Sequence, residues 1–231
     1  MKKVLITGAT SGIGYATLKD LVKKYEVIFT YCHNETKALE IANKYHIKGH
    51  QLDLESKESI EKLVDNIDDL DILINNAAIA MDNSFDEKTY EEFSKVININ
   101  LTGTYYLTKL LSKKINKDGN ILFISSTNGI DTCYIESIDY DASKAGVISL
   151  MHNFAKELAP IRVNTIAPGW VDTEMNISLS PDFRKQEENK ILLKRFANPE
   201  EISKVIEFII SRDASYINDT VIRVDGGVNN G

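Results

Sequence analysis

A tyrosine and a lysine stand four residues apart, at Tyr140 and Lys144, a spacing that places both side chains on one face of a helix. A tyrosine with an ordinary pKa of about 10 exchanges protons poorly at neutral pH. A neighbouring ammonium group favours the phenolate and lowers that pKa toward the working range. The pair could therefore serve as an acid/base, although taken alone it also fits an ordinary surface pair on a helix.

A glycine-rich turn follows the first apolar run, where Lys3–Thr7 leads into Thr7–Gly14 (TGATSGIG) and a helical segment follows. A phosphate group needs backbone N–H donors at close range and a helix N-terminus pointing at it, and glycine leaves room for that approach. Gly8, Gly12 and Gly14 therefore predict a dinucleotide diphosphate site. Their spacing differs from the Gly-x-Gly-x-x-Gly of most dinucleotide-binding folds, and a tight turn without a ligand is the alternative.

Short apolar runs alternate along the chain with segments of helical periodicity. Strands that are apolar throughout are buried on both faces, and their alternation with helices implies a parallel sheet covered on both sides. We therefore predict one α/β domain over residues 1–231, a doubly wound Rossmann-type fold with a seven-stranded parallel sheet and helices on both faces. The predicted strands are Lys3–Thr7, Glu26–Tyr31, Lys48–Leu52, Asp71–Asn75, Asn120–Ser125, Ile161–Ala167 and Thr220–Val224. The predicted helices are Gly12–Lys24, Glu35–Tyr45, Ser56–Ile67, Asp86–Lys114, Tyr140–Leu158 and Pro199–Ser211.

The segment Glu174–Asn198 lies between the sixth strand and the last long helix and is polar and mixed in composition. A long connection at this place is often an active-site lid, and it can equally be a plain surface connection. We predict a lid over the substrate.

Composition and charge narrow the function classes. The chain has 231 residues, two cysteines and a formal net charge of −7, so its diffuse acidic surface gives no footprint for nucleic acid or an anionic membrane. Cys32 and Cys133 cannot form a disulfide framework, which fits a reducing compartment. The histidines show no metal-ligand spacing, and no apolar run approaches the length of a membrane span or a signal-peptide core. We expect a cytoplasmic protein without a metal, nucleic-acid or membrane partner.

Several short motifs follow one another along the whole chain. They are Thr7–Gly14, Asn75–Ala78, Ile99–Gly103, Ser125–Ser126, Tyr140–Lys144, Pro168–Thr173 and Asp225–Gly227. In this combination and order the chain resembles the short-chain dehydrogenase/reductase family, and within it looks most like the 3-oxoacyl-[acyl-carrier-protein] reductases of fatty-acid biosynthesis. One departure is Ala78, where the family usually has glycine. The added methyl group should be tolerated if the backbone there is not at positive φ.

The resemblance implies a catalytic set made of Asn100, Ser126, Tyr140 and Lys144. Tyr140 is then the acid/base, Lys144 also hydrogen-bonds the nicotinamide ribose, and Asn100 marks a helix irregularity and holds a water that links Lys144 to solvent. Ser126 ends a strand at the carboxyl edge of the sheet, and its hydroxyl would donate to the substrate carbonyl oxygen. Its neighbour Ser125 is the rival for this role. The expected substrate contacts are Ser126, Asn128, Tyr140 and Trp170.

The resemblance also implies a nicotinamide dinucleotide bound over the carboxyl edge of the sheet. Asp53 would bind the adenine amino group, or else it would be the N-cap of the next helix. The segment Pro168–Thr173 would hold the carboxamide. The expected cofactor contacts are Gly8, Thr10, Ser11, Gly12, Ile13, Gly14, Tyr31, His33, Asp53, Leu54, Asn76, Ala77, Ala78, Tyr140, Lys144, Pro168, Gly169, Val171 and Thr173.

The end of the second strand predicts NADPH in preference to NADH. An acidic side chain there binds the ribose 2′-hydroxyl and repels a 2′-phosphate, and by resemblance Tyr31 holds that place. The preference should be modest, because no arginine is available, and should strengthen below about pH 6.5, where histidine gains a proton. The candidate phosphate donors are Ser11, His33, Asn34 and Lys37.

These features together predict an NAD(P)H-dependent carbonyl reductase or alcohol dehydrogenase, with 3-oxoacyl thioesters of acyl carrier protein as the best substrate class. A reductase of a sugar, a polyol or another small ketone is one alternative. A dinucleotide-sensing regulator without turnover is another, although it would not need the complete catalytic set. The net charge of −7 and the absence of a basic residue at Asn120 weigh against docking of an acidic carrier protein.

The family's assembly implies that the helices Asp86–Lys114 and Tyr140–Leu158 pack against their copies. Their outward faces are expected to carry more apolar residues than one core stripe needs. We predict a homotetramer with dihedral symmetry, or a dimer as the simpler form. The apolar residues in question are Leu107, Leu110, Leu111, Ile148 and Met151.

Overall fold

Seven parallel strands form one sheet in the order β3-β2-β1-β4-β5-β6-β7, in a computed structural model that describes residues 1–228. The predicted fold class is therefore confirmed, and residues 229–231 of the predicted domain lie outside the described residues. The strands are β1 (Lys3–Ile6), β2 (Glu26–Tyr31), β3 (Lys48–Gln51), β4 (Leu70–Asn75), β5 (Ile115–Ile124), β6 (Arg162–Pro168) and β7 (Val221–Val224). The α-helices are α1 (Gly12–Leu21), α2 (Glu35–Tyr45), α3 (Lys57–Asp65), α4 (Tyr90–Ile97), α5 (Thr104–Leu111), α6 (Ile138–Glu157), α7 (Pro181–Lys190) and α8 (Pro199–Ile210).

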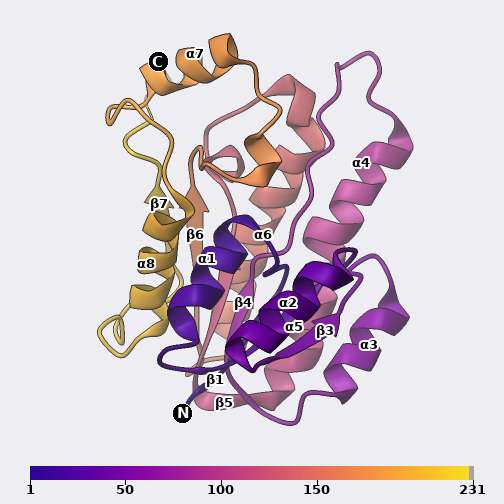
Figure 1. The fold of residues 1–231 in the computed structure, drawn as a ribbon, viewed down its shortest axis with the longest axis vertical. Helices are drawn as coiled ribbons and strands as arrows, with labels where there is room; N and C mark the ends of the chain where they lie inside the picture. The colour runs from indigo at the N-terminus through magenta and orange to yellow at the C-terminus, as the bar shows by residue number, and fades with distance from the viewer. Residues whose placement is uncertain (229–231) are drawn as a thin grey trace.

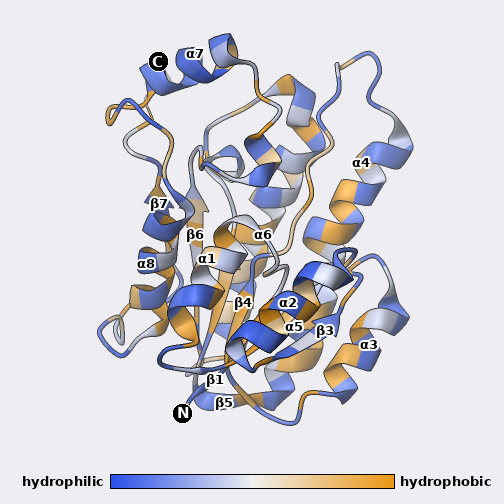
Figure 2. Ribbon diagram, in the orientation of Figure 1, coloured by the Kyte–Doolittle hydropathy of each residue, from blue (hydrophilic) through white to orange (hydrophobic). Residues whose placement is uncertain are grey.

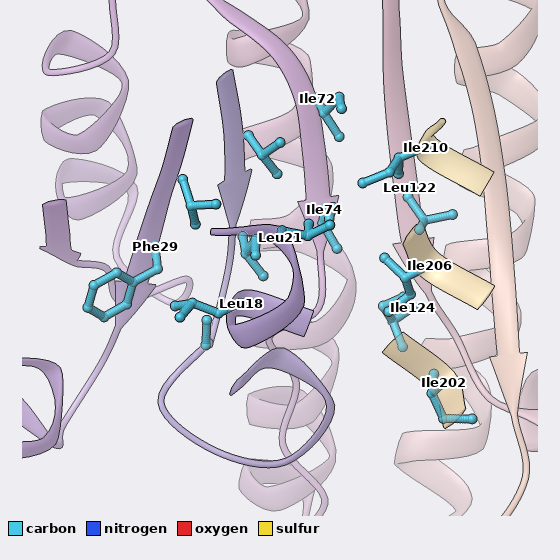
Figure 3. Packing of buried hydrophobic residues seen from close by; sticks show 14 of the residues in the cluster. Leu18, Leu21, Phe29, Ile72, Ile74, Leu122, Ile124, Ile202, Ile206 and Ile210 are labelled. Carbon is cyan, nitrogen blue, oxygen red and sulfur yellow. The ribbon is translucent and has the colours of Figure 1, made fainter. Parts of the chain in front are cut away.

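Helices cover both faces of this sheet (Figure 1). Successive side chains of a strand point to opposite faces, so Ile72 and Ile74 of β4 pack with α1 and α8, whereas Leu73 packs with α3, α5 and α6. Figure 3 shows the first of these layers, where Leu18 of α1 lies beside Phe29 of β2. Burial on both faces explains why the strand sequences are apolar throughout.

Side-chain caps fix where several helices begin. Asn34 accepts a hydrogen bond from the backbone of Lys37 at the start of α2, and Ser56 caps α3. Thr89 and Glu92 form a capping box at the start of α4. Each cap satisfies backbone N–H groups that have no partner within the helix.

The predicted helix Asp86–Lys114 is wrong in its bounds. The helical run begins at Tyr90, because Thr89 caps it, and α5 ends at Leu111 before a short 3₁₀ turn. Between α4 and α5 the chain forms a π-helix over Asn98–Gly103. The adjoining strand β5 begins five residues before the predicted start at Asn120, at Ile115.

The segment Glu174–Asn198 contains a helix that the apolar spacing did not indicate, α7. Figure 2 shows α7 as almost entirely hydrophilic, so it offers no apolar stripe to read. Its start is fixed by Ser180, whose side chain accepts from the backbone of Phe183, and by Pro181 at the first helical position. The helix is joined to the body by Arg184, which donates to both carboxylate oxygens of Asp172 at 2.6 and 3.0 Å.

Candidate functional site

A cleft of about 500 Å³ lies at the carboxyl edge of the sheet, where the strand order reverses between β1 and β4. Open α/β sheets bind their ligands at such a switch point. Every residue that the sequence predicted to contact the cofactor lines this one cleft, from Gly8 in the glycine-rich turn to Thr173 after β6. Chain segments far apart in sequence are thus brought to one crevice of a size that suits a dinucleotide.

The glycine-rich turn is braced by the Asn-Asn motif after β4. The side-chain amide of Asn76 donates to the carbonyl oxygens of Thr7 and Gly8 at 2.9 and 3.0 Å. Gly8 has φ of +64°, and a Cβ on Gly14 would lie 2.5 Å from the Asn76 amide nitrogen, so neither position accepts a side chain without movement. The backbone at Ala78 is not at positive φ, as its alanine requires.

The N-terminus of α1 has no anionic side chain of its own. Ser11 at the N-cap makes no side-chain cap, and the first turn holds no acidic residue. Instead the carboxylate of Glu174 accepts a hydrogen bond from the backbone N–H of Gly12 at 3.0 Å. A carboxylate oxygen of Glu174 therefore occupies the place at the helix N-terminus where the backbone N–H groups favour an anion.

Tyr140 and Lys144 lie together at the other end of the cleft, in the first two turns of α6. The Ser126 side chain lies close enough to the Tyr140 hydroxyl to favour its ionised form, and the Ser126 hydroxyl donates to the side-chain oxygen of Asn128 at 3.2 Å. The Lys144 ammonium lies 5.4 Å from the centre of the Tyr140 ring. Lys144 is only 3% exposed, and its ammonium group donates to the carbonyl oxygen of Ile124 at 2.8 Å. Ser125 also lines the cleft, but its hydroxyl donates to the backbone carbonyl of Lys144 at 2.8 Å, so Ser126 rather than its rival contacts the tyrosine.

Burial sets the ionisation of both groups. It raises the pKa of Tyr140 to about 12 and lowers the pKa of Lys144 to about 8, because desolvation disfavours each charged form. The expected lowering of the Tyr140 pKa by Lys144 is therefore wrong. Tyr140 holds its proton at neutral pH, which suits a proton donor.

Asn100 lies within the π-helix and is buried. Its side chain bonds both backbone groups of Ile79, at 2.9 and 2.8 Å, and its amide donates to the Ser143 hydroxyl of α6 at 3.1 Å. The helix irregularity expected at Asn100 is thus present as this π-helix. π-Helical turns are uncommon and often occur at functional sites. The bridging water stays a prediction.

Two predicted substrate contacts lie outside the cleft lining. The Asn128 amide donates to Asp141 at 2.6 Å, which places it behind Ser126. Trp170 donates from its indole nitrogen to the buried carboxylate of Glu187 at 3.1 Å and stacks on Phe196. Both side chains hold the loop after β5 and α7 in place, and a direct contact with substrate stays a prediction for them.

Asp53 is not the N-cap of α3, because Ser56 has that role. The Asp53 carboxylate accepts from the backbone of Glu55 at 2.9 Å and lines the cleft, which leaves it free to meet a ligand. Lys37, a candidate phosphate donor, pairs with Glu40 and does not line the cleft. Other lining residues belong to none of the motifs and were not predicted to contact the cofactor, among them Cys32, Glu55, Lys95, Glu174 and Asn176.

Similarity to known proteins decides the family. The family model described as Enoyl-(Acyl carrier protein) reductase matches residues 8–229. The chain belongs to the short-chain dehydrogenase/reductase family. As a member it is an NAD(P)-dependent oxidoreductase that acts on CH–OH and C=O groups, and the predicted enzyme class is confirmed.

Relatives in this family cover nearly the whole chain. The 3-oxoacyl-[acyl-carrier-protein] reductase FabG of Aquifex aeolicus is 40% identical, over 98% of this chain and 97% of its own length. A tropinone reductase homolog of Arabidopsis thaliana is 35% identical, over 98% of this chain and 91% of its own length. The crystal structure of BdcA in complex with NADPH superposes with a TM-score of 0.93 at 26% identity, over 99% and 94% of the two chains.

The remaining expectations concern metal ions, membrane-spanning helices and the two cysteines. Within residues 1–228, no three His, Cys, Asp or Glu side chains are grouped so that they could hold a metal ion. No helix in that part of the chain is long and apolar enough to cross a bilayer. Cys32 and Cys133 are free thiols.

Proposed function

We propose that this protein is an NADPH-dependent reductase of 3-oxoacyl thioesters carried on acyl carrier protein. The observation that carries the proposal is the contact between the hydroxyls of Ser126 and Tyr140 in the cleft that the glycine-rich turn also lines. Two hydroxyl groups at one point can both donate to a carbonyl oxygen. The 40% identity to a 3-oxoacyl-[acyl-carrier-protein] reductase over the full chain supports the substrate class.

The bound nicotinamide cofactor supplies the hydride in this reaction. Ser126 and Tyr140 hold the ketone oxygen of the substrate and stabilise the negative charge that develops there. Tyr140 then gives its proton to that oxygen, and the positive charge of Lys144 stabilises the phenolate that remains. Asn100 fixes α6 against the segment after β4 through Ser143 and Ile79, which keeps Tyr140 and Lys144 at their places.

The cofactor preference rests on the second strand. Tyr31 lines the cleft at the end of β2, where an aspartate would repel a 2′-phosphate. A structural neighbour with NADPH bound has the same fold over nearly its whole length. These observations support NADPH as the preferred cofactor, with NADH as the alternative.

Two observations weigh against docking of an acidic carrier protein. Asn120 is buried in β5, where its amide donates to the carbonyl oxygen of Ile209, so it forms no part of a docking surface. The net charge of −7 also repels an acidic partner at long range. A sugar, a polyol or another small ketone is therefore the second candidate substrate.

Rates on three substrates test the substrate class. We expect NADPH oxidation with a 3-oxoacyl thioester of acyl carrier protein to exceed the rate with the same acyl group on coenzyme A, and both to exceed the rate with a bare small ketone. Equal or reversed rates would assign the protein to the small-ketone reductases.

We further propose that Glu174–Asn198 covers the substrate and that the protein assembles as a homotetramer or, failing that, a dimer in the cytoplasm. One argument for the assembly is wrong, because Leu107, Leu111 and Met151 are fully buried core residues. Leu110 and Ile148 are only partly buried, and Tyr105 stacks on Phe154 at the surface of the same two helices. These residues leave a smaller apolar face for a partner copy.

A further inference from the structure

Within residues 1–228, two lysines and no arginine line the cleft, and the lysines are Lys144 and Lys95. Lys144 belongs to the catalytic end, where it is bound to the backbone of β5. Lys95 lies in the last turn of α4 and is exposed. In the described part of the chain no carboxylate forms a salt bridge with it, so its ammonium group is available to a ligand.

Lys95 faces the adenosine end of the cleft. It shares a helix face with Ile99, four residues on, which lines the cleft as well. Its ammonium group acts electrostatically on the thiol of Cys32, whose pKa is nevertheless raised, because burial and Asp53 oppose it. Cys32 directly follows Tyr31, so the charge of Lys95 is felt at the place where an aspartate would exclude a 2′-phosphate.

The helix that carries Lys95 is fixed in place. A capping box closes its start at Thr89, and the neighbouring residue Val96 is completely buried. A lysine on a rigid helix loses less freedom when it binds than one on a mobile loop. The other lysine considered for this role, Lys37, is paired with Glu40 and lies outside the cleft lining.

We infer that Lys95 binds the 2′-phosphate of NADPH and sets the preference of this protein for NADPH over NADH. The inference rests on the proposed NADPH preference and deepens it by naming the cation. An ammonium group that donates to a phosphate monoester makes a charge-assisted hydrogen bond, which the 2′-hydroxyl of NADH cannot match. The position is on α4, away from both the glycine-rich turn and the residues that follow β2.

The test compares cofactors that differ only in the 2′-phosphate. In Lys95→Met, the ratio of kcat/KM for NADPH to that for NADH should fall about tenfold, as expected from the loss of one charge-assisted hydrogen bond. The Kd of 2′,5′-ADP should rise by a similar factor relative to that of 5′-AMP, which reports binding without turnover. Lys95→Arg should keep most of the preference. Lys44→Met, which removes one exposed charge on α2 away from the cleft lining, should leave both ratios unchanged.

Three results would overturn the inference. If the wild type prefers NADPH and Lys95→Met keeps the same ratio of kcat/KM for NADPH to that for NADH, Lys95 does not bind the 2′-phosphate. The proposed function would be unaffected. Equal losses of kcat/KM with both cofactors would mean that Lys95 contacts the adenine or stabilises the cleft instead. A wild-type protein that prefers NADH would overturn the proposed cofactor and the role of Lys95 together.

Discussion

The Glu174 carboxylate accepts a hydrogen bond from the backbone N–H of Gly12, at 3.0 Å, at the mouth of the dinucleotide cleft. Both residues line that cleft. A diphosphate bound at the start of α1 needs the same class of donor. A cofactor diphosphate bound at this helix start, as the sequence predicts, would compete with Glu174 for the same donor, and the segment after β6 would then give up this contact.

Removal of this competitor should tighten cofactor binding. In Glu174→Ala the Kd of NADPH, measured by fluorescence titration, should fall roughly two- to tenfold, as expected for one charged contact at a helix terminus. Glu174→Gln should lie between this variant and the wild type. Asp182→Asn, which removes one exposed charge from the first turn of α7, is the matched control and should have little effect. Weaker binding in Glu174→Ala would mean that the carboxylate helps to hold the cofactor.

The low pKa of Lys144 predicts how the reaction depends on pH. Burial lowers that pKa to about 8, so Lys144 is cationic below this pH and neutral above it. Since its charge stabilises the Tyr140 phenolate, kcat/KM for carbonyl reduction should fall as the pH rises above about 8. Lys144→Met has no ammonium group to titrate and should be slow at every pH without this step. A wild-type profile that stays level from pH 7 to 10 would contradict the role of Lys144.

A buried ion pair supports the start of α6. Lys88 donates to Asp139 at 3.0 Å, with side chains only 6% and 0% exposed, and Asp139 also accepts from the backbone of Tyr140 at 2.9 Å. Loss of one partner leaves a buried charge uncompensated. Lys88→Met and Asp139→Asn should each lower the free energy of unfolding by about 3–5 kcal/mol.

Urea denaturation checks this expectation. The double variant Lys88→Met/Asp139→Asn should lose less than the sum of the single losses, because neither charge is then left alone. Single losses below about 1 kcal/mol would show that the pair is solvated or dispensable.

The fold could be predicted from the sequence because burial leaves a strong pattern. The run Val4–Ile6 is apolar at every position and becomes a central strand that is buried on both faces. The bounds of the helices were harder to predict, because capping residues rather than the apolar periodicity decide where a helix begins. Thr89 caps a helix that begins at Tyr90, four residues after the predicted start at Asp86, and Ser180 and Pro181 start a helix that has no apolar face.

The catalytic end of the site could be predicted because its residues stand in motifs. Tyr140 and Lys144 lie together in the structure as their spacing implied, and Ser126 lies beside Tyr140 as the family resemblance implied. Lys95 and Glu174 could not be predicted, since a charged residue on an exposed helix or loop looks like ordinary solvated surface. Only the fold brings Lys95 to the cleft that Cys32 also lines and Glu174 onto Gly12.

The oligomeric state can be measured directly. We expect light scattering at micromolar concentration to give the mass of a tetramer or a dimer, since helices α5 and α6 still present partly exposed apolar residues such as Leu110 and Ile148. A stable monomer would show that Tyr105 and Phe154 merely cover each other.

The substitution Tyr140→Phe tests the central claim most directly, because it removes one hydroxyl and keeps the ring. With NADPH and a 3-oxoacyl thioester, kcat should fall by a factor of about 10³, within the usual range for a lost general acid. The Kd of NADPH should stay within about threefold, since the glycine-rich turn and Asn76 are untouched. Tyr90→Phe, at a tyrosine that is 81% exposed, should retain full activity as the matched control. A Tyr140→Phe variant that keeps most of the wild-type kcat would contradict the role of Tyr140 as proton donor.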